Sequence, residues 1–320
     1  MKLQTKIPLE KQSNNLIDYN SNILLIGSCF SENIGNKLEY FKFQNLQNPF
    51  GILFHPKAIE RLFENAISKK KYTKADVFFL NEQWHCFDGH SKLSKPSKDD
   101  LLNFLNEQLE ITNTQIYNSS HVIVTLGTAW VYRNIDSNTI VANCHKVPQK
   151  QFDKELLSVE LICQSLKNII DLIQSKNPKV SVIFTVSPVR HLKDGFIENM
   201  QSKAHLIAAV HQLLSNSAES RNLNYFPSYE IMMDELRDYR FYNEDMIHPS
   251  ELAINYIWEA FKTVWVSEEV SKIMDDVDYI QKGLQHKPFN QNSEAHIQFL
   301  EKLESRKQIL ASKLPHIKFS

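Results

Sequence analysis

The sequence predicts an α/β fold of three layers, with helices on both faces of a parallel sheet of about five strands. Three runs of aliphatic and β-branched residues carry this prediction, namely Asn22–Ile26, His121–Leu126 and Val180–Val186. Each run is too short for a helix and almost continuously apolar, which is typical of a strand buried on both faces. Each ends at a glycine or at a Ser-Pro pair, where the strand should stop.

Helices are predicted between and after these strands. Apolar residues recur there every three or four positions, which indicates helices with one buried face. The predicted helices are Phe30–Tyr40, Pro56–Ile67, Asp99–Gln115, Lys154–Gln174, Asn199–Leu214 and Glu251–Val270. Strands that alternate with helices in this way favour a doubly wound, mostly parallel sheet.

Shorter apolar segments predict strands or hairpin pieces on the rim of the sheet. These segments are Val77–Leu80, Trp84–Phe87, Trp130–Tyr132 and Thr139–Val141. They are expected to form rim insertions at about residues 75–93 and 131–151 of a single domain that spans residues 1–275. Substrate specificity is expected to lie in these insertions.

The C-terminal part, residues 276–320, is predicted to be a helical extension. The pattern changes from about Tyr279, through a polar segment that contains proline, to a charged helix over Glu294–Leu314. The apolar residues on one stripe of that helix are Ile297, Leu300, Leu303 and Ile309. The helix would pack on the domain or on another copy of the chain, which leaves a homodimer through this helix open.

The composition argues against several classes of protein. The 320 residues are 42% hydrophobic and 23% charged, with a formal net charge of -1, whereas nucleic-acid-binding proteins usually carry a basic excess. No run approaches the roughly 20 apolar residues of a membrane span, and the N-terminus lacks the apolar core of a signal peptide. We therefore expect a cytoplasmic protein without nucleic-acid or membrane partners.

The cysteines are expected to be free thiols, because their spacing is wide and irregular. They are Cys29, Cys86, Cys144 and Cys163. The pairs His85-Cys86 and Cys144-His145 do not have the spacing of a usual structural zinc site, so no metal is expected.

Chemistry is expected at the carboxyl ends of the strands, where open parallel sheets bind ligands. Asp245 and His248 lie three residues apart in a segment near the end of the domain. In a turn, this spacing lets the carboxylate accept from one imidazole nitrogen while the other faces outward, as in the back half of a hydrolase triad. The alternative is an ordinary surface Asp–His pair.

The first strand leads directly into two candidate nucleophiles, Ser28 and Cys29. Both would lie at a helix N-terminus, where unpaired backbone N–H groups can lower the pKa of a thiol or hold an oxyanion. The alternative is structural, with Ser28 capping the helix and Cys29 acting as a small buried apolar residue.

In their order along the chain, these segments resemble the SGNH (GDSL-like) hydrolase superfamily and, within it, the GSCFA family. Gly27-Ser28-Cys29-Phe30 matches four of the five letters of the family's motif, and Ser31 stands in place of its Ala. Further segments that look like the family are Asn48–Pro56, Val124–Tyr132, Cys144–Phe152, Ser187–His191 and Tyr225–Ser250. The resemblance covers about residues 5–265.

The resemblance assigns roles to single positions. The superfamily's nucleophile falls on Cys29, and its Asp falls on Ser28. The glycine whose N–H helps to form an oxyanion hole is matched by Gly51. The third block keeps its glycine as Gly127 but lacks its Asn, a donor whose loss can cost about a hundredfold in rate. Asn48 is a candidate to compensate because it is close in sequence to Gly51.

The resemblance also extends to the last block, Asp-x-x-His, which is matched by Asp245 and His248. It implies a hydrolase or acyltransferase that acts on a small-molecule or glycan ester without a cofactor, with Cys29 as nucleophile, His248 as general base and Asp245 orienting it. One alternative makes Ser28 the nucleophile. The other is a catalytically inactive module that binds a carbohydrate or acyl ligand.

Three more residues follow predicted strands. Arg190 and His191 are placed to bind a substrate carboxylate or phosphate, or else to form a salt bridge at a helix entry. Trp130 would line the pocket or cover the edge of the sheet.

Overall fold

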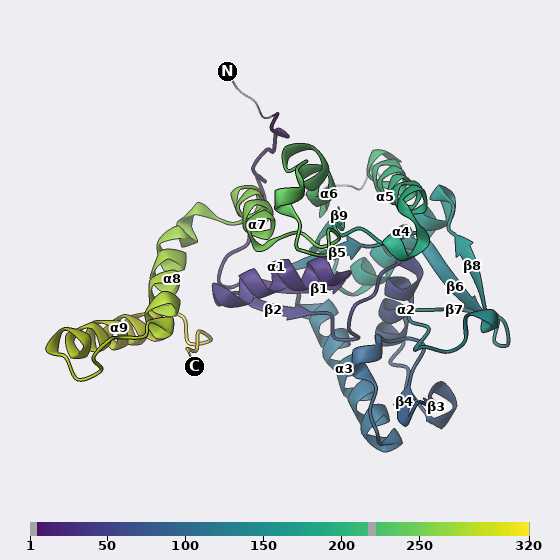
Figure 1. Ribbon diagram of the computed structural model, residues 1–320, viewed down its shortest axis with the longest axis horizontal. Helices are drawn as coiled ribbons and strands as arrows, with labels where there is room; N and C mark the ends of the chain where they lie inside the picture. Colours follow the sequence, from purple (N-terminus) through teal and green to yellow (C-terminus); the bar gives the residue numbers. More distant parts are fainter. Residues whose placement is uncertain (1–4, 217–221, 320) are drawn as a thin grey trace.

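A computed structural model describes residues 5–216 and 222–319 and contains three layers (Figure 1). The middle layer is a parallel sheet with the strand order β10-β9-β5-β1-β2. Its strands are β1 (Asn22–Gly27), β2 (Gln44–Gln47), β5 (His121–Leu126), β9 (Ser181–Val186) and β10 (Leu223–Tyr225). This architecture confirms the predicted fold class. The three predicted strands form the centre of the sheet, and every residue of β5 and β9 is buried.

Each face of the sheet has its own hydrophobic core, because successive side chains of a strand point to opposite faces. Along β1, Leu24 and Ile26 pack in one core, and Ile23 and Leu25 in the other. The first core is covered by α2 (Pro56–Ile67), α3 (Lys98–Asn118), α4 (Val159–Lys176) and α5 (Phe196–Asn216). The second core is covered by α1 (Cys29–Tyr40) and α7 (Glu251–Trp265), with the short α6 (Ser228–Glu230) leading to them.

The rim insertions contain two small antiparallel sheets. The first is a hairpin of β3 (Phe78–Leu80) and β4 (Gln83–His85). The second has the order β7-β6-β8 and is formed by β6 (Trp130–Asn134), β7 (Thr139–Val141) and β8 (Phe152–Leu156).

Two predicted helix bounds differ from the structure by five residues each. The helix expected from Lys154 begins at Val159, because residues 152–156 pair with β6 and the hydroxyl of Ser158 caps the helix at the N–H of Leu161. The helix expected to run to Val270 ends at Trp265, where Val266 turns to an extended conformation and pairs with Ile17.

The C-terminal helices α8 (Ser271–Gln285) and α9 (Glu294–Lys313) form an arm that extends from the body of the molecule (Figure 1). Helix α8 continues past Tyr279, where the sequence pattern changes. On α9 the buried side chains are Leu303 and Leu310, whereas the other three residues of the predicted stripe are about half exposed. The predicted stripe is therefore wrong in part, because α9 turns only its Leu303 side toward Gly283 of α8.

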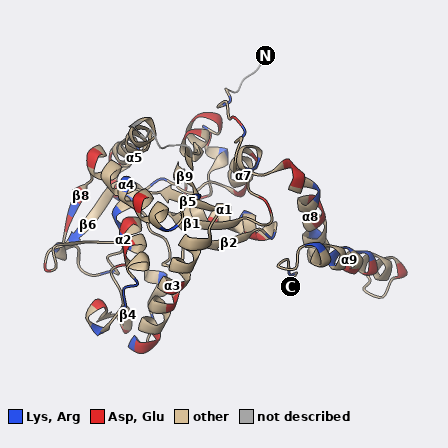
Figure 2. Cartoon of the chain, turned by 180° about the vertical axis from the view of Figure 1, so that it is seen from behind, with Lys and Arg blue, Asp and Glu red and all other residues tan. Residues whose placement is uncertain are grey.

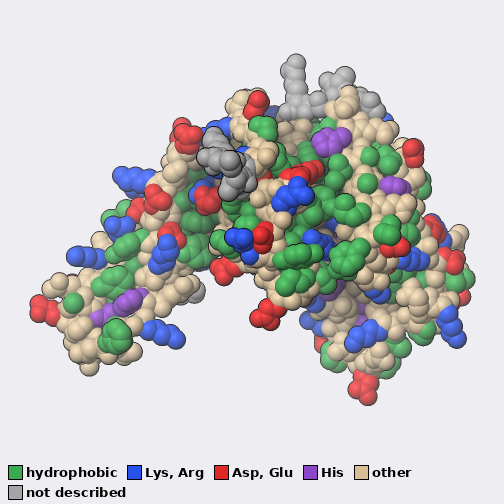
Figure 3. Space-filling view, turned by 45° about the horizontal axis from the view of Figure 1, so that its top comes forward, with side chains coloured by type: hydrophobic (Ala, Val, Ile, Leu, Met, Phe, Trp, Pro, Cys, Tyr) green, Lys and Arg blue, Asp and Glu red, His purple; other side chains and the backbone are tan. Residues whose placement is uncertain are grey.

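The surface carries both signs of charge. Lys and Arg positions are interspersed with Asp and Glu positions along the helices and loops (Figure 2). Hydrophobic side chains lie among the charged ones on the face that is seen when the top of the molecule in Figure 1 is turned forward (Figure 3). Within residues 5–216 and 222–319, no helix has the length and apolar character needed to cross a membrane.

The buried His55 makes the stability of the fold depend on pH. It caps α2 by accepting the N–H of Ala58 at Nδ1, and its Nε2 donates to the Val141 carbonyl at 3.0 Å. Burial lowers the pKa of His55 to about 4, so below pH 6.5 the unfolded chain takes up a proton that the folded chain excludes until about pH 4. The free energy of unfolding should therefore fall as the pH is lowered through this window.

His55→Asn keeps a capping side chain and removes the titration. We expect its free energy of unfolding, measured by urea denaturation from pH 7 to pH 4, to fall less steeply than that of the wild type, by up to about 1.4 kcal/mol per pH unit. His211→Asn, at an exposed histidine, is the control and should keep the wild-type slope. Equal slopes for wild type and His55→Asn would contradict this account.

Candidate active site

The junction between β1 and α1 is a turn that only glycine can make. Gly27 has a φ of 138°, and a Cβ atom on it would lie 2.0 Å from the carbonyl oxygen of Thr125. The N–H of Gly27 donates to Asn48 Oδ1 at 2.9 Å. The turn places Ser28 and Cys29 at the N-terminus of α1, at the carboxyl edge of the sheet.

Ser28 and Cys29 differ in accessibility. Ser28 is fully buried, and its Oγ accepts the N–H of Phe30 at 3.3 Å, so it caps α1 as the structural alternative predicted. Cys29 is only partly buried. Among the residues that the structure describes, only the backbone N–H groups of Cys29 itself and of Phe30 hydrogen-bond to its sulfur. Of the two candidate nucleophiles, the thiol is the one that a ligand can reach.

Opposing effects act on the Cys29 thiol. Burial raises its pKa, and the carboxylate of Glu32, one turn along α1, adds to the rise. The ammonium of Lys203 and the N–H groups of Cys29 and Phe30 lower the pKa. The net direction is upward, so the thiol needs a base to remove its proton.

Asp245 holds His248 in one orientation. Asp245 Oδ1 accepts the backbone N–H groups of Ile247 and His248, at 2.9 and 3.0 Å. Its Oδ2 lies 2.6 Å from His248 Nδ1. These three contacts lower the pKa of Asp245 to about 2, and the hydrogen bond from the backbone N–H of His248 has the largest effect. Because the carboxylate is ionised, it accepts a proton-bearing Nδ1, and Nε2 remains as the basic nitrogen.

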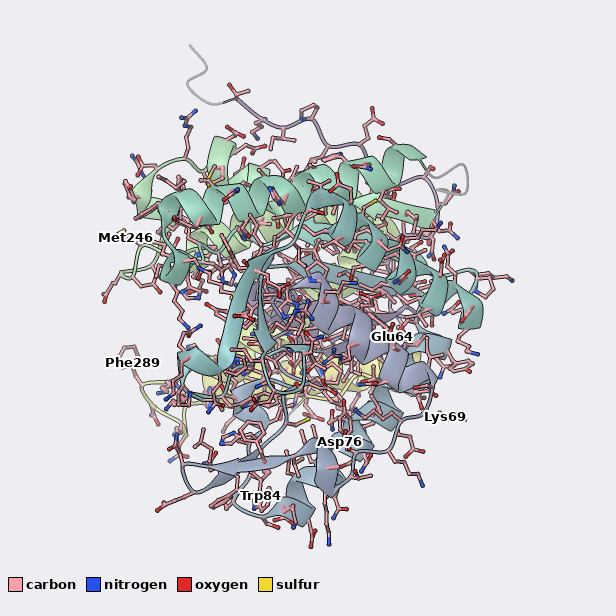
Figure 4. All side chains as sticks on the ribbon, turned by 90° about the vertical axis from the view of Figure 1, so that its right-hand side faces the viewer. Glu64, Lys69, Asp76, Trp84, Met246 and Phe289 are labelled. Carbon is pink, nitrogen blue, oxygen red and sulfur yellow. The ribbon has the colours of Figure 1, made fainter. Side chains whose placement is uncertain are left out.

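Arg190 ties this turn to the loop that follows β9. Its backbone N–H donates to the Ile247 carbonyl at 3.3 Å, and its Nη1 donates to the Met246 carbonyl at 3.2 Å. The guanidinium also stacks 4.1 Å from the ring centroid of Tyr242. Met246 lies at the outer edge of the molecule (Figure 4). Arg190 is thus engaged in holding the turn that carries His248.

The structure does not join His248 to Cys29. The side chains of His248 and Asp245 are 47% and 45% exposed, and no hydrogen bond between His248 and Cys29 or Ser28 occurs in the described part of the chain. Cys29 follows β1 at the carboxyl edge, and the loop after β9 holds the turn that carries His248, but no described hydrogen bond joins the two candidate residues.

One turn of α5 organises the loops at this edge through three buried polar side chains, which we call the α5 polar turn. Asn199 Oδ1 accepts the backbone N–H of His191 at 2.9 Å, and Ser202 Oγ accepts that of Ala129 at 2.7 Å. Lys203 is 1% exposed. Its Nζ donates to the carbonyls of Gly127 and Ser187, each at 2.7 Å, which joins the ends of β5 and β9.

Sequence reasoning missed the α5 polar turn, although a signal was present. Asn199 and Lys203 lie on the same helical stripe as the buried Leu206 and Val210, so polar residues occupy core positions. Burial lowers the pKa of Lys203 to about 7, against the opposing effect of the Cys29 thiolate. When Lys203 is charged it has three donors, of which the described contacts use two.

His191 lies beside Gly127 and the nucleophile turn. A Cβ atom on Gly127 would lie 3.1 Å from His191 Nε2 and 3.2 Å from Ser28 Cβ. The His191 ring packs edge-on against Phe54, with centroids 5.2 Å apart. Burial, followed by the charges of Lys203 and His248, lowers the pKa of His191 to about 3, so the ring is neutral at pH 7.

Three other predicted residues are engaged elsewhere. The N–H of Gly51 donates to the Asn48 carbonyl at 2.7 Å, which closes a turn, so in this geometry it is not available to an oxyanion. Asn48 directs its amide nitrogen toward Glu32, at 3.5 Å. Trp130 Nε1 donates to the Glu198 carbonyl, and the Lys154 ammonium covers its ring.

The histidines beside Cys86 and Cys144 bind protein groups. His85 contacts Ser94 Oγ and the Leu80 carbonyl, and His145 Nε2 donates to the Cys86 carbonyl. Among the residues that the structure describes, no three His, Cys, Asp or Glu side chains are grouped to hold a metal ion.

Replacement of Lys203 tests its effect on the thiol. Lys203→Met keeps the length of the side chain and removes the charge that lowers the pKa of Cys29. We expect the rate of alkylation of Cys29 by iodoacetamide at pH 6.5, where Lys203 keeps most of its charge, followed by peptide mass spectrometry, to fall. Lys193→Met is the control, because the Lys193 ammonium lowers the pKa of Cys144 instead. An unchanged rate for Cys29 at this pH in a folded Lys203→Met protein would refute this effect.

Comparisons with known proteins give matches to families and to solved structures. A comparison with curated proteins gave no match. A crystal structure of an acetyl esterase mutant with acetate is 11% identical, covers 80% of this chain and 99% of its own, and has a TM-score of 0.36. A carbohydrate esterase of family 3 from Talaromyces cellulolyticus is 10% identical, with coverages of 80% and 99% and a TM-score of 0.37. An acetyl xylan esterase from the rumen bacterium Butyrivibrio proteoclasticus is 10% identical, with coverages of 84% and 66% and a TM-score of 0.39.

These TM-scores are too low to carry an argument about activity. The family matches are more extensive. A model described as "GSCFA family" matches residues 22–261, and one described as "GSCFA domain protein, C-terminal domain" matches residues 277–320. The first match alone covers most of the chain and includes the turn at Cys29 and the Asp245–His248 pair, so the chain belongs to the GSCFA family.

Proposed function

We propose that this protein is an SGNH-type hydrolase or acyltransferase that acts on a small-molecule or glycan ester. The observation that supports it most is the Asp245–His248 pair, whose 2.6 Å contact leaves Nε2 as a base at the sheet edge that also carries Cys29. The reachable thiol at the N-terminus of α1 is the nucleophile in this proposal.

The reaction has two stages. His248 Nε2 takes the thiol proton while the Cys29 sulfur forms a bond to the ester carbonyl carbon, and the carbonyl electron pair moves to its oxygen. When that pair returns, the alkoxide leaves and takes the proton from His248. Water or an acceptor hydroxyl then attacks the thioester carbon and gives its proton to His248, the C–S bond breaks, and the Cys29 sulfur takes the proton back, which gives hydrolysis or acyl transfer.

Catalysis requires His248 to approach Cys29. Because Asp245 fixes the orientation of the imidazole, the exposed turn that carries both residues moves toward Cys29 as a unit in this account. Catalytic hydrogen bonds are often long in unliganded enzymes and tighten when substrate binds. In this account the ester completes the contact between the base and the nucleophile.

A second candidate is a module that binds a carbohydrate or acyl ligand without catalysis. Two observations favour it: the pKa of the Cys29 thiol is raised, and no described hydrogen bond joins the thiol to His248. Such a module would keep the shape of the site and lack turnover.

Labelling of single variants separates the two candidates. We expect p-nitrophenyl acetate to acetylate Cys29 in the wild type, measured by release of p-nitrophenolate and by peptide mass spectrometry. Cys29→Ala should abolish this labelling, and His248→Ala should slow it by about 10²–10⁴-fold, as loss of a general base does. Cys144→Ala, at another partly buried thiol, is the matched control and should behave as the wild type.

Ser28→Ala tests the other nucleophile. It removes a helix cap, so it should lower the free energy of unfolding by about 1 kcal/mol and leave acetylation of Cys29 in place. Loss of labelling in Ser28→Ala alone would make Ser28 the nucleophile. Absence of acetylation at both residues in the wild type would contradict the enzyme and favour the binding module.

A further inference from the structure

We propose that His191 is a catalytic residue whose Nε2–H donates to the oxyanion formed during acyl transfer, in place of the Asn that the site lacks. This inference rests on the proposed function and adds to it a donor for the developing charge. The observation behind it is that His191 Nε2 is enclosed by protein and has no hydrogen-bond partner among the described residues.

Two other ring nitrogens among the described residues, His145 Nδ1 and His316 Nε2, are also enclosed without a partner, but His145 is anchored through its Nε2 and His316 lies in the C-terminal part of the chain. Nε2 of His55, His121 and His145 lies 2.7 to 3.0 Å from a backbone carbonyl in each case. A buried polar group left without a partner costs about 1–3 kcal/mol. That cost is recovered if a ligand oxygen accepts from His191 Nε2 when it binds.

This nitrogen lies beside the turn that carries the nucleophile. Gly127 has no side chain, so the His191 ring can approach the end of β5 next to Ser28, the residue that precedes Cys29. Both His191 Nε2 and Ser28 Cβ lie within 3.2 Å of the point that a Cβ of Gly127 would occupy. The nitrogen thus faces the turn that carries the thiol.

The ring is held in place from several directions. Asn199 accepts the backbone N–H of His191, and Phe54 packs edge-on against the imidazole. Burial lowers the pKa of the ring, the charge of Lys203 adds to this effect, and the imidazole is therefore neutral at pH 7. A neutral imidazole has one N–H. Nδ1 is not among the enclosed atoms, so water can donate to it while Nε2 carries the hydrogen.

Other donors at the site are few. The N–H of Gly51 is used in a turn, and Ala129 and its neighbours offer no side-chain amide. In the described part of the chain, the N–H of Cys29 donates only to its own sulfur, so it can supply one donor once that sulfur is bonded to the substrate carbon. His191 Nε2 supplies a second.

The two donors act at one step of the reaction. When the sulfur bonds to the carbonyl carbon, the C=O electron pair moves to oxygen, and both N–H groups donate to that oxyanion. When the pair returns, the C–O bond to the alkoxide breaks and His248 gives up its proton. His191 donates a hydrogen bond throughout and transfers no proton.

Two reactions of the same thiol test this role. Acetylation by p-nitrophenyl acetate passes through an oxyanion, whereas alkylation by iodoacetamide displaces iodide at a saturated carbon and forms none. His191→Phe keeps a ring against Phe54 and removes the donor, and His191→Leu is a second variant in case one fails to fold. We expect either change to slow acetylation of Cys29 by about 10²-fold or more and to leave its alkylation rate close to that of the wild type.

His191→Gln carries an amide N–H at a similar distance from the backbone and should restore most of the acetylation rate. His211→Gln, at an exposed histidine of α5, is the matched control and should match the wild type in both reactions.

Three outcomes overturn the proposal. Acetylation that is unchanged in His191→Phe and His191→Leu would show that no donor is needed there. An equal loss of acetylation and alkylation would make His191 a base or a structural support. A wild type that is alkylated at Cys29 and never acetylated would refute the proposed function itself, and the oxyanion role with it.

Discussion

The site depends on one buried ammonium group. Lys203 reaches from α5 to the carbonyls that end β5 and β9, and this pair of 2.7 Å contacts fixes where the two following loops begin. A buried cation is costly unless its donors are satisfied. The carbonyls of Gly127 and Ser187 satisfy two of these donors. The position of the Lys203 ammonium is therefore determined by the backbone at the ends of β5 and β9.

The electrostatic character of the edge follows from this contact. Burial raises the pKa of the Cys29 thiol and lowers the pKa of the His191 imidazole, and the charge of Lys203 opposes the first shift and adds to the second, so the ring is neutral and the thiol keeps its proton until a base removes it. Asn199 and Ser202, the other members of the α5 polar turn, accept backbone N–H groups of the two loops. The Asp245–His248 pair makes no contact with the α5 polar turn that the described hydrogen bonds show, and both side chains are exposed. In this account the base therefore moves, whereas the nucleophile and its surroundings stay fixed.

Local sequence patterns predicted the centre of the fold. Features that depend on contacts between residues far apart in the sequence could not be predicted. Continuous apolar runs predicted the three central strands. Strand β8 was not predicted, because Phe152–Leu156 is largely polar and lies on the rim. The Asp245–His248 contact followed from spacing within one turn. Lys203 could not be assigned, because its partners lie 76 and 16 residues away. The turn bond that occupies the Gly51 N–H is likewise invisible in sequence.

A crystal structure of the protein with an acetyl group on Cys29, after treatment with p-nitrophenyl acetate, tests the central claim most directly. The account predicts the acyl carbon on the Cys29 sulfur, its carbonyl oxygen about 2.7–3.1 Å from both His191 Nε2 and the Cys29 nitrogen, and His248 turned toward the thioester. An acetyl group on Ser28, or a carbonyl oxygen directed into solvent away from His191, would contradict it.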